Sequence, residues 1–278
     1  MGACVFFSCH DDPIAPSPET VVDYTFQVFV RQQGSIDELS TRAADLIYSL
    51  LVVDVQGDSC VQQLSRLQLP AADALAQVQL PLRQGAHRIC FLCSAKPWDN
   101  FNADQLWVNW SEPSYPLGEV WSTVVDVQVD GTESQQKEVR LNRAVSYVRA
   151  TLQDALPQEL ARFRQVLVGG SWTYSLLSQS GALPSQIVHD FTLQPQHLGV
   201  SGQSIGLYTF VPEGKNSATS YTLQAFDANQ TLFQSITFDD VPLVVNQYTN
   251  YQGNFFTSTS RFQLSLEDEW LQPNIIPF

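Results

Sequence analysis

The sequence of 278 residues is short of charge, and most of the charge that it has is negative. Charged side chains make up 15% of the chain, whereas about a quarter is usual. There are 14 Lys and Arg residues against 28 Asp and Glu residues, which gives a formal net charge of -14. Nucleic acids and anionic lipid surfaces repel such a chain, so we expect no nucleic acid among its partners.

Long apolar runs and catalytic signatures are also missing. No run of about 18 apolar residues occurs, so no segment is predicted to span a membrane as a helix. The sequence has no HExxH, GxSxG, P-loop or GxGxxG pattern. We therefore expect no catalytic residues, no metal and no cofactor, and the chain is not predicted to be an enzyme. A glycan hydrolase, which needs two carboxylates across a sugar cleft, is a minor alternative.

Cysteines are few and odd in number. The five are Cys4, Cys9, Cys60, Cys90 and Cys93. Cys90 and Cys93 have CxxC spacing, but the apolar run 88–93 around them is typical of a strand, whereas a redox CxxC opens a helix. A second CxxC that would complete a zinc site does not occur. We therefore interpret both thiols as buried small apolar groups.

Histidine and tryptophan offer two further candidate binding sites. His189 and His197 are close in sequence, but they lack metal-ligand spacing, so we interpret them as surface-loop residues. Four of the six tryptophans fall between Trp98 and Trp121, where a platform for sugars is one hypothesis. Packing in the core and in hairpins is the favoured interpretation of these rings.

Alternation of apolar and polar residues dominates the chain. It occurs at 24–30, 78–82, 89–93, 125–129, 221–225 and 262–266. A period of two predicts strands with one buried face, and the segment 46–53, apolar on both sides, predicts a central strand. One short helix is expected from Leu156-Pro157, because Pro suits the first helical position and Leu160 and Phe163 would then share a face.

The polar stretch 130–137 is the best candidate for a linker between domains. Short strands at spacings near ten residues on either side of it favour β-sandwiches. We predict an all-β protein with a truncated lipoprotein signal and tether at 1–20. An N-terminal β-sandwich is expected over 21–132 and a C-terminal β-sandwich over 133–278.

The residues before the first predicted strand point to lipidation. Val5-Phe6-Phe7-Ser8 precedes Cys9, and His10-Asp11-Asp12 follows it. This order resembles a lipoprotein processing site followed by the outer-surface export signal of Bacteroidales lipoproteins. The apolar stretch is shorter than the about 7–15 residues of an ordinary signal peptide, and a basic region is missing. We predict a lipid on Cys9.

Three segments together resemble the Bacteroidales fimbrillin family. The first is 40–57, in which Thr41-Arg42-Ala43 precedes an apolar stretch that ends at Gly57. The second, 139–148, looks like the strand that opens the family's second domain. The third, 242–256, contains the Asn-x-x-Thr-x-x-x-Gly spacing from Asn246 to Gly253. A last strand that ends near Trp270 completes the likeness in the same order.

The resemblance implies two tandem transthyretin-like (Greek-key) β-sandwiches and export to the outer membrane as a lipoprotein. It also implies that an arginine-specific protease removes the first strand, here 24–30, by a cut at Arg42 or Arg31. The groove left behind then accepts a donor strand from a neighbouring subunit. In this chain the apolar tail with Ile275, Ile276 and Phe278 would be that donor.

The function that follows is that of a structural subunit of a bacterial surface fimbrium, or pilus, that contributes to cell adhesion. Its expected partners are other fimbrial subunits, the processing protease and, through the N-terminal lipid, the outer membrane. A stalk, a tip and an anchor subunit all remain open. The alternative is a secreted carbohydrate-binding adhesin module that does not polymerise.

Overall fold

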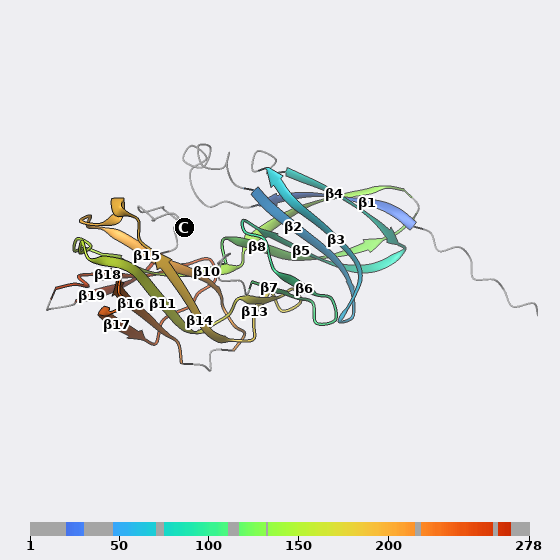
Figure 1. Cartoon of the computed structure of the whole chain (residues 1–278). Coiled ribbons are helices and arrows are strands. Elements are labelled where there is room, and N and C mark those ends of the chain that lie inside the picture. The colour runs from blue at the N-terminus through green and yellow to red at the C-terminus, as the bar shows by residue number, and fades with distance from the viewer. Residues whose placement is uncertain are drawn as a thin grey trace, which may run out of the picture.

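The computed structural model describes residues 21–30, 47–70, 75–110, 117–131, 133–214, 218–257 and 261–267. These residues form an elongated all-β molecule with two bodies of strands (Figure 1). The only helix in the described part of the chain is a single 3-10 turn, Pro195–His197. None of the described segments forms a helix with the length and apolar character needed to cross a membrane.

The first body is a sandwich of two layers, which we call the first sandwich. One layer consists of β4 (Leu75–Arg83), β1 (Val21–Val30) and β9 (Gln135–Arg143). The other consists of β3 (Ser59–Pro70), β2 (Ile47–Gln56), β5 (Gly85–Ser94) and β8 (Val120–Val129). The layers are continuous, because β8 pairs with β9 where Trp121 faces Arg143.

Alternating side chains of these strands fill the space between the two layers. The core of the first sandwich includes Val22, Phe26, Val52, Leu80, Phe91 and Leu141. The strand β2 is buried on both faces, because Leu50 and Val52 enter this core while Leu51 and Val53 point to the opposite side. The predicted central strand at 46–53 is therefore confirmed from residue 47 onward, and residue 46 lies outside the described residues.

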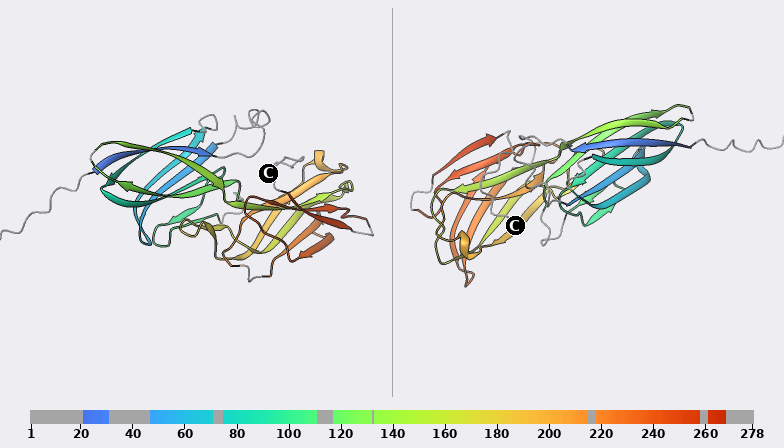
Figure 2. Two further views of the ribbon diagram at one scale, coloured as in Figure 1. Left: turned by 180° about the vertical axis from the view of Figure 1, so that it is seen from behind. Right: turned by 90° about the horizontal axis from the view of Figure 1, so that it is seen from above.

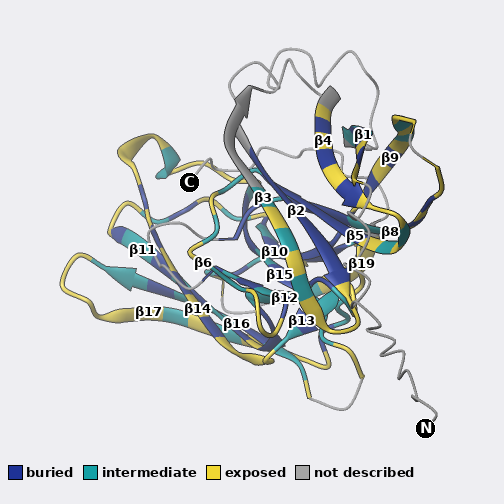
Figure 3. Ribbon diagram, turned by 90° about the vertical axis from the view of Figure 1, so that its right-hand side faces the viewer, coloured by how far each residue is buried: buried dark blue, intermediate teal, exposed yellow. Residues whose placement is uncertain are grey.

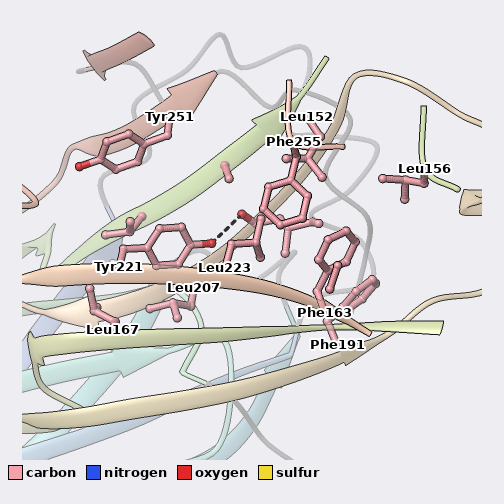
Figure 4. Close-up of a cluster of buried hydrophobic side chains, with 14 of the residues drawn as sticks. Leu152, Leu156, Phe163, Leu167, Phe191, Leu207, Tyr221, Leu223, Tyr251 and Phe255 are labelled. Atoms are coloured by element: carbon pink, nitrogen blue, oxygen red, sulfur yellow. Dashed lines mark hydrogen bonds between the residues drawn. The ribbon is translucent and has the colours of Figure 1, made fainter. Parts of the chain in front are cut away.

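The second body, the second sandwich, is built from two four-stranded sheets. One sheet has the order β15 (Gln203–Phe210), β10 (Val145–Leu152), β18 (Tyr248–Gly253) and β19 (Phe262–Glu267). The other has the order β14 (Ser185–Thr192), β11 (Leu160–Gly170), β16 (Ser220–Asp227) and β17 (Leu232–Asp239). Phe163, Leu207, Tyr221 and Phe255 fill the space between them (Figure 4).

A small sheet links the two bodies, and we call it the junction sheet. Its order is β13 (Ser180–Ala182), β12 (Thr173–Ser175), β7 (Trp107–Asn109) and β6 (Asn100–Asn102). Because β7 comes from the first half of the chain and β12 from the second, their pairing ties the halves together. The third core, the junction core, lies here and includes Leu92, Val108, Tyr147, Tyr174, Phe210 and Tyr248.

The helix predicted from Leu156-Pro157 is wrong. The residues after Leu156 form a turn, and Leu160 begins the strand β11. A register shift between Leu160 and Arg162 places one extra residue in β11 opposite β16. Such a β-bulge puts two residues against one, so Leu160 and Phe163 both reach the core although they are three positions apart. A spacing that suits a helix therefore arises here from an irregular strand.

The alternation at 262–266 was expected to mark a buried face, which holds for the partly buried Phe262 but is wrong for Leu264 and Leu266. Leu264 and Leu266 are 53% and 50% exposed, although each lies on the side of β19 that points toward the second core. The reason is that β19 is the last strand of its sheet and pairs with β18 alone among the described strands. The segments 24–30, 78–82, 125–129 and 221–225 do form strands with one buried face, whereas 89–93 forms a strand that is buried on both faces.

The division of the chain into 21–132 and 133–278, and the transthyretin-like topology of each part, stay predictions. Beyond residue 132, β9 hydrogen-bonds to β1 and so lies in the first sandwich, whereas β10 lies in the second. The segment 139–148, which looked like a single opening strand, is thus shared between two strands that Ala144 separates. The expected linker residues 135–137 are part of β9.

Candidate functional site

The strand β1 is the element on which the expected function depends, and it occupies the middle of its layer. It runs antiparallel to β4, from the pair Val21–Arg83 to the pair Phe29–Leu75. It also runs parallel to β9, from Tyr24–Gln135 to Val30–Leu141. Figure 2 shows β1, in blue, beside the green strands of the first sandwich. Both of its backbone edges are therefore hydrogen-bonded.

One face of β1 is buried and the other is not. Val22, Tyr24, Phe26 and Val28 enter the first core, whereas Val21 is 53% exposed. The ring of Phe26 lies 4.7 Å from that of Tyr24 and 5.2 Å from that of Phe91, measured between centroids. Burial of each large apolar side chain contributes about 1.5–3 kcal/mol. The strand is thus bound to the sandwich by its side chains as well as by its backbone.

The predicted site residues themselves lie outside the described part of the chain. They are Cys9, Arg31, Arg42, Ile275, Ile276 and Phe278. The structure therefore leaves their roles as predictions. The structure does describe the two strands next to them in sequence. The strand β1 follows Cys9 and precedes both arginines, and the strand β19 precedes the tail.

The CxxC pair is buried in β5, as predicted, and its two thiols point to opposite faces. Cys93 lies in the first core and Cys90 in the junction core. Burial raises the pKa of each thiol to about 12. Two side chains on opposite faces of one strand cannot bind one metal ion or form a disulfide with each other. A group of three or more His, Cys, Asp or Glu placed to hold a metal does not occur in the described residues.

The interpretation of His189 as a surface-loop residue is wrong. It lies in β14 and is 7% exposed, and its Nδ1 is 3.3 Å from Nε2 of the fully buried Gln165. Gln165 in turn accepts a hydrogen bond from the hydroxyl of Tyr221 at 2.9 Å. Burial lowers the pKa of His189. These groups form a polar network inside the second sandwich, which explains the histidine without a metal.

The tryptophans are mostly used for packing. Trp110 and Trp121 are buried, and the ring of Trp110 lies 5.3 Å from that of Phe210 in the second sandwich. Trp98 and Trp107 are partly buried and contribute to the junction. Because they are buried, Trp110 and Trp121 cannot form a platform that contacts sugars.

The junction between the sandwiches is a feature that the sequence did not predict. The hydroxyl of Thr173 donates to Oδ1 of Asn109 at 3.0 Å, across the pair β7–β12. Nη1 of Arg143 donates to Oδ1 of Asn246, in the second half of the chain, at 3.3 Å, and Nη2 of Arg143 donates to Oε1 of Glu119 at 2.9 Å. Burial raises the pKa of Glu119, and the charge of Arg143 offsets only part of that effect. Pairing between residues so far apart in sequence leaves no local pattern that would reveal it.

Comparison with known proteins identifies the fold. Neither a protein-family model nor a curated protein matches the chain. Among solved structures, a "putative adhesin" of Bacteroides thetaiotaomicron is 10% identical, with a TM-score of 0.53 over 91% of this chain and 98% of that one. A "putative adhesin" of Bacteroides ovatus is 12% identical, with a TM-score of 0.52 over 86% and 88%.

The tip fimbrial protein of Porphyromonas gingivalis also matches, at 9% identity over 90% of this chain and 100% of that one, but its TM-score of 0.48 carries no argument. The likeness to the two Bacteroides structures extends through both sandwiches and the junction between them. The chain therefore has the fold of these adhesin-type proteins, and its resemblance to the Bacteroidales fimbrillin family is confirmed at the level of the fold.

Proposed function

We propose that this chain is a cell-surface adhesion protein that serves as a structural subunit of a fimbrium. The observation that carries the proposal is the fold shared over 91% of this chain and 98% of a Bacteroides protein described as a "putative adhesin". The three fimbrillin-like segments, which include β2, β9 with β10, and β18, support it from the sequence side. A place at the outer surface of the cell follows from the same proposal.

Assembly by strand exchange is the proposed mechanism, and the position of β1 supports it. Loss of β1 would leave β4 and β9 each with an unpaired edge. It would also open a groove that Val22, Tyr24, Phe26 and Val28 now fill. A strand from a neighbouring subunit that places apolar side chains at alternate positions would restore both the hydrogen bonds and the core.

Digestion with an arginine-specific protease tests this mechanism. We expect a cut at Arg42 or Arg31, loss of the segment that contains β1, and polymers on size-exclusion chromatography. A variant truncated after Trp270 should be cut in the same way and should stay monomeric, because it lacks the donor tail. The double variant Arg31→Lys/Arg42→Lys should resist the cut and also stay monomeric.

The outcome that contradicts strand exchange is a cut protein that loses β1 and remains a monomer with its tail intact. In that case the non-polymerising carbohydrate-binding adhesin becomes the better proposal. Its binding surface would then be sought on a glycan array, with Trp98→Ala and Trp107→Ala as the variants, since these rings are not fully buried.

Anchoring through a lipid on Cys9 is proposed from the sequence resemblance. Mass spectrometry of the protein from native outer membranes should show a lipid-modified Cys9 at the new N-terminus. Cys9→Ser should release the protein from the membrane fraction. Recovery of unmodified Cys9 within an intact N-terminal segment would contradict the proposal.

A further inference from the structure

The sheet formed by β14, β11, β16 and β17 has an exposed outer face. Val168 of β11 and Val188 of β14 point away from the second core and are 39% and 42% exposed. Figure 3 shows β14 and β17 largely in the colours of intermediate and exposed residues. The face is therefore a surface on which the second sandwich can contact a ligand.

Two arginines of β11 lie side by side on this face. Phe163 between them enters the second core, so Arg162 and Arg164 point outward. Asp190 of β14 binds both of them. Its Oδ1 accepts hydrogen bonds from Nη1 of Arg162 at 3.0 Å and from Nε of Arg164 at 2.8 Å. Its Oδ2 accepts one from Nη2 of Arg164 at 2.9 Å, so a single carboxylate fixes two guanidinium groups.

The guanidinium of Arg162 has two further contacts that hold it in place. Its carbon lies 4.1 Å from the centroid of the Phe226 ring in β16, and its Nε donates to Oε1 of Gln230 at 2.9 Å. The guanidinium carbon of Arg164 lies 5.9 Å from the centroid of the same ring. A ligand that binds a mobile side chain must offset the entropy lost when that side chain becomes ordered. Here the ordering has already taken place in the folded protein.

The arginine pair carries more positive charge than its cross-strand neighbours neutralise. The residues opposite the two arginines in β14 and β16 are Thr192, Asp190, Phe226 and Gln224, and Asp190 alone among them is acidic. The hydrogen bond from Arg164 lowers the pKa of Asp190, so this carboxylate is ionised at neutral pH. Two positive charges thus meet one negative charge, on a protein whose formal net charge is -14.

Both guanidinium groups keep N–H donors that a ligand can use. Each arginine has five such donors, and the hydrogen bonds to Asp190 and Gln230 use two in each. The side chain of Arg164 is 37% exposed and that of Arg162 is 16% exposed. The planar guanidinium matches the two oxygens of a carboxylate. A second carboxylate therefore fits here without displacing Asp190.

Exposed apolar side chains lie on both sides of the charged groups. On one side, Leu232 of β17 pairs with Phe226 and is 50% exposed. On the other side, Val188 lies two positions before Asp190 in β14 and is 42% exposed. An inorganic anion would contact the guanidinium groups alone. A sugar acid combines a carboxylate with a ring whose C–H groups are apolar, so it suits both parts of this surface.

We propose that Arg162 and Arg164 form a binding site for a carboxylate-bearing sugar, that is, a uronic acid or a sialic acid. The carboxylate accepts hydrogen bonds from the remaining N–H donors of the two arginines, and the sugar ring packs on the apolar side chains beside them. The inference rests on the proposed role in adhesion and names the class of ligand. Repulsion by the net charge of the protein is screened beyond about 8 Å at physiological ionic strength, so the local charge determines binding.

Titration of the full-chain monomer with defined sugars, followed by NMR, tests the site. A galacturonic acid trisaccharide is compared with the neutral galactose trisaccharide, and sialyllactose is compared with lactose, so the two arms distinguish uronic from sialic acids. We expect one acidic sugar to bind about tenfold or more tightly than its neutral counterpart. Arg162→Gln/Arg164→Gln should remove this difference. Arg162→Lys/Arg164→Lys should weaken binding of the acid, because lysine keeps the charge but lacks the planar fork.

Arg88→Gln is the matched control. Arg88 is also an exposed arginine bound by one aspartate, with its Nε 2.8 Å from Oδ1 of Asp126, but it lies in β5 of the first sandwich. This variant should bind the acidic sugar as the wild type does. A urea titration of each variant shows that it is folded.

Should the double glutamine variant fail to fold, Arg164→Gln decides, because Arg164 is the more exposed of the two arginines. Equal binding of acidic and neutral sugars by the wild type, or no binding of either acid, would overturn the proposal. Unchanged binding of the acid in the folded glutamine variant would overturn it as well. The assay needs no polymer, so the site can fail while fibre assembly holds, and the site can bind sugar in a protein that does not polymerise.

Discussion

At the scale of single residues, His189 makes the stability of the second sandwich depend on pH. Burial lowers its pKa, and the neighbouring Asp190 offsets part of that effect. In the unfolded chain, His189 therefore binds a proton at about pH 6.5, whereas in the folded chain it binds a proton only at lower pH. The stabilising effect of neutral His189 is fully present above that pH and is lost as the pH falls toward the lowered pKa.

We therefore expect the urea midpoint to fall between pH 7 and pH 5, and His189→Gln to flatten this dependence. Tryptophan fluorescence during urea titration at several pH values measures it. Thr192→Ser, on the exposed face of the same strand, is the control and should leave the profile unchanged. Equal slopes for the wild type and His189→Gln would show that other groups cause the dependence.

Cys90 and Cys93 give a second prediction at this scale. Their raised pKa of about 12 leaves only a very small fraction as thiolate at pH 8, and thiolate is the reactive form. We expect iodoacetamide to modify both residues at least tenfold more slowly in the native protein than in urea, as measured by peptide mass spectrometry. Similar rates in the two conditions would mean that β5 opens readily.

At the scale of elements, close packing at Gly206 determines how β15 lies against β10. A Cβ atom at this position would be 2.6 Å from the carbonyl oxygen of Val148 and 2.7 Å from Cζ of Tyr147. Gly206→Ala should therefore lower the free energy of unfolding by about 1–3 kcal/mol, the usual effect of overpacking. Urea denaturation measures this change.

Ser235→Ala, at an exposed position of β17, is the control for Gly206→Ala and should change stability by about 0.5 kcal/mol or less. If Gly206→Ala also left the free energy of unfolding unchanged, this would contradict the prediction. It would mean that β15 moves away from β10 without loss of stability.

At the scale of the whole molecule, the junction core should make the two sandwiches unfold together. Phe210 belongs to β15 of the second sandwich and is fully buried, yet its ring lies 5.3 Å from that of Trp110 in the first half of the chain. It also lies 4.8 Å from the ring of Tyr174 in the junction sheet. We expect Phe210→Ala to lower the free energy of unfolding by about 3–5 kcal/mol.

Because both bodies use Phe210, its truncation should speed amide hydrogen exchange in β5 as well as in β15. Leu223→Ala is the matched control, since Leu223 lies in the core of the second sandwich alone, and its effect should be concentrated in β11, β14 and β16. Undiminished protection of β5 in Phe210→Ala would mean that the sandwiches unfold independently.

Period-two alternation allowed the strands to be predicted, because each strand has one face toward a core and local sequence records that directly. The segments 24–30 and 89–93 became β1 and β5, and the segment that is apolar on both sides became the central strand β2, which is described from Ile47. Local pattern was misleading where a β-bulge in β11 gave Leu160 and Phe163 a helix-like spacing, and where β19 lay at the edge of its sheet. In both places the neighbours of the strand, and not its own residues, determined burial.

What the sequence by itself determined is thus the all-β class, the order of most strands, the burial of the CxxC pair and the family that the chain resembles. Only the tertiary structure decided that β1 lies between β4 and β9, that Asn109 meets Thr173 across 64 positions, and that Arg149 is buried on an outer face. The physical reason is that these arrangements depend on contacts between segments far apart in the chain. Local alternation reports which face of a strand is apolar but not which strand, or which half of the molecule, comes to cover it.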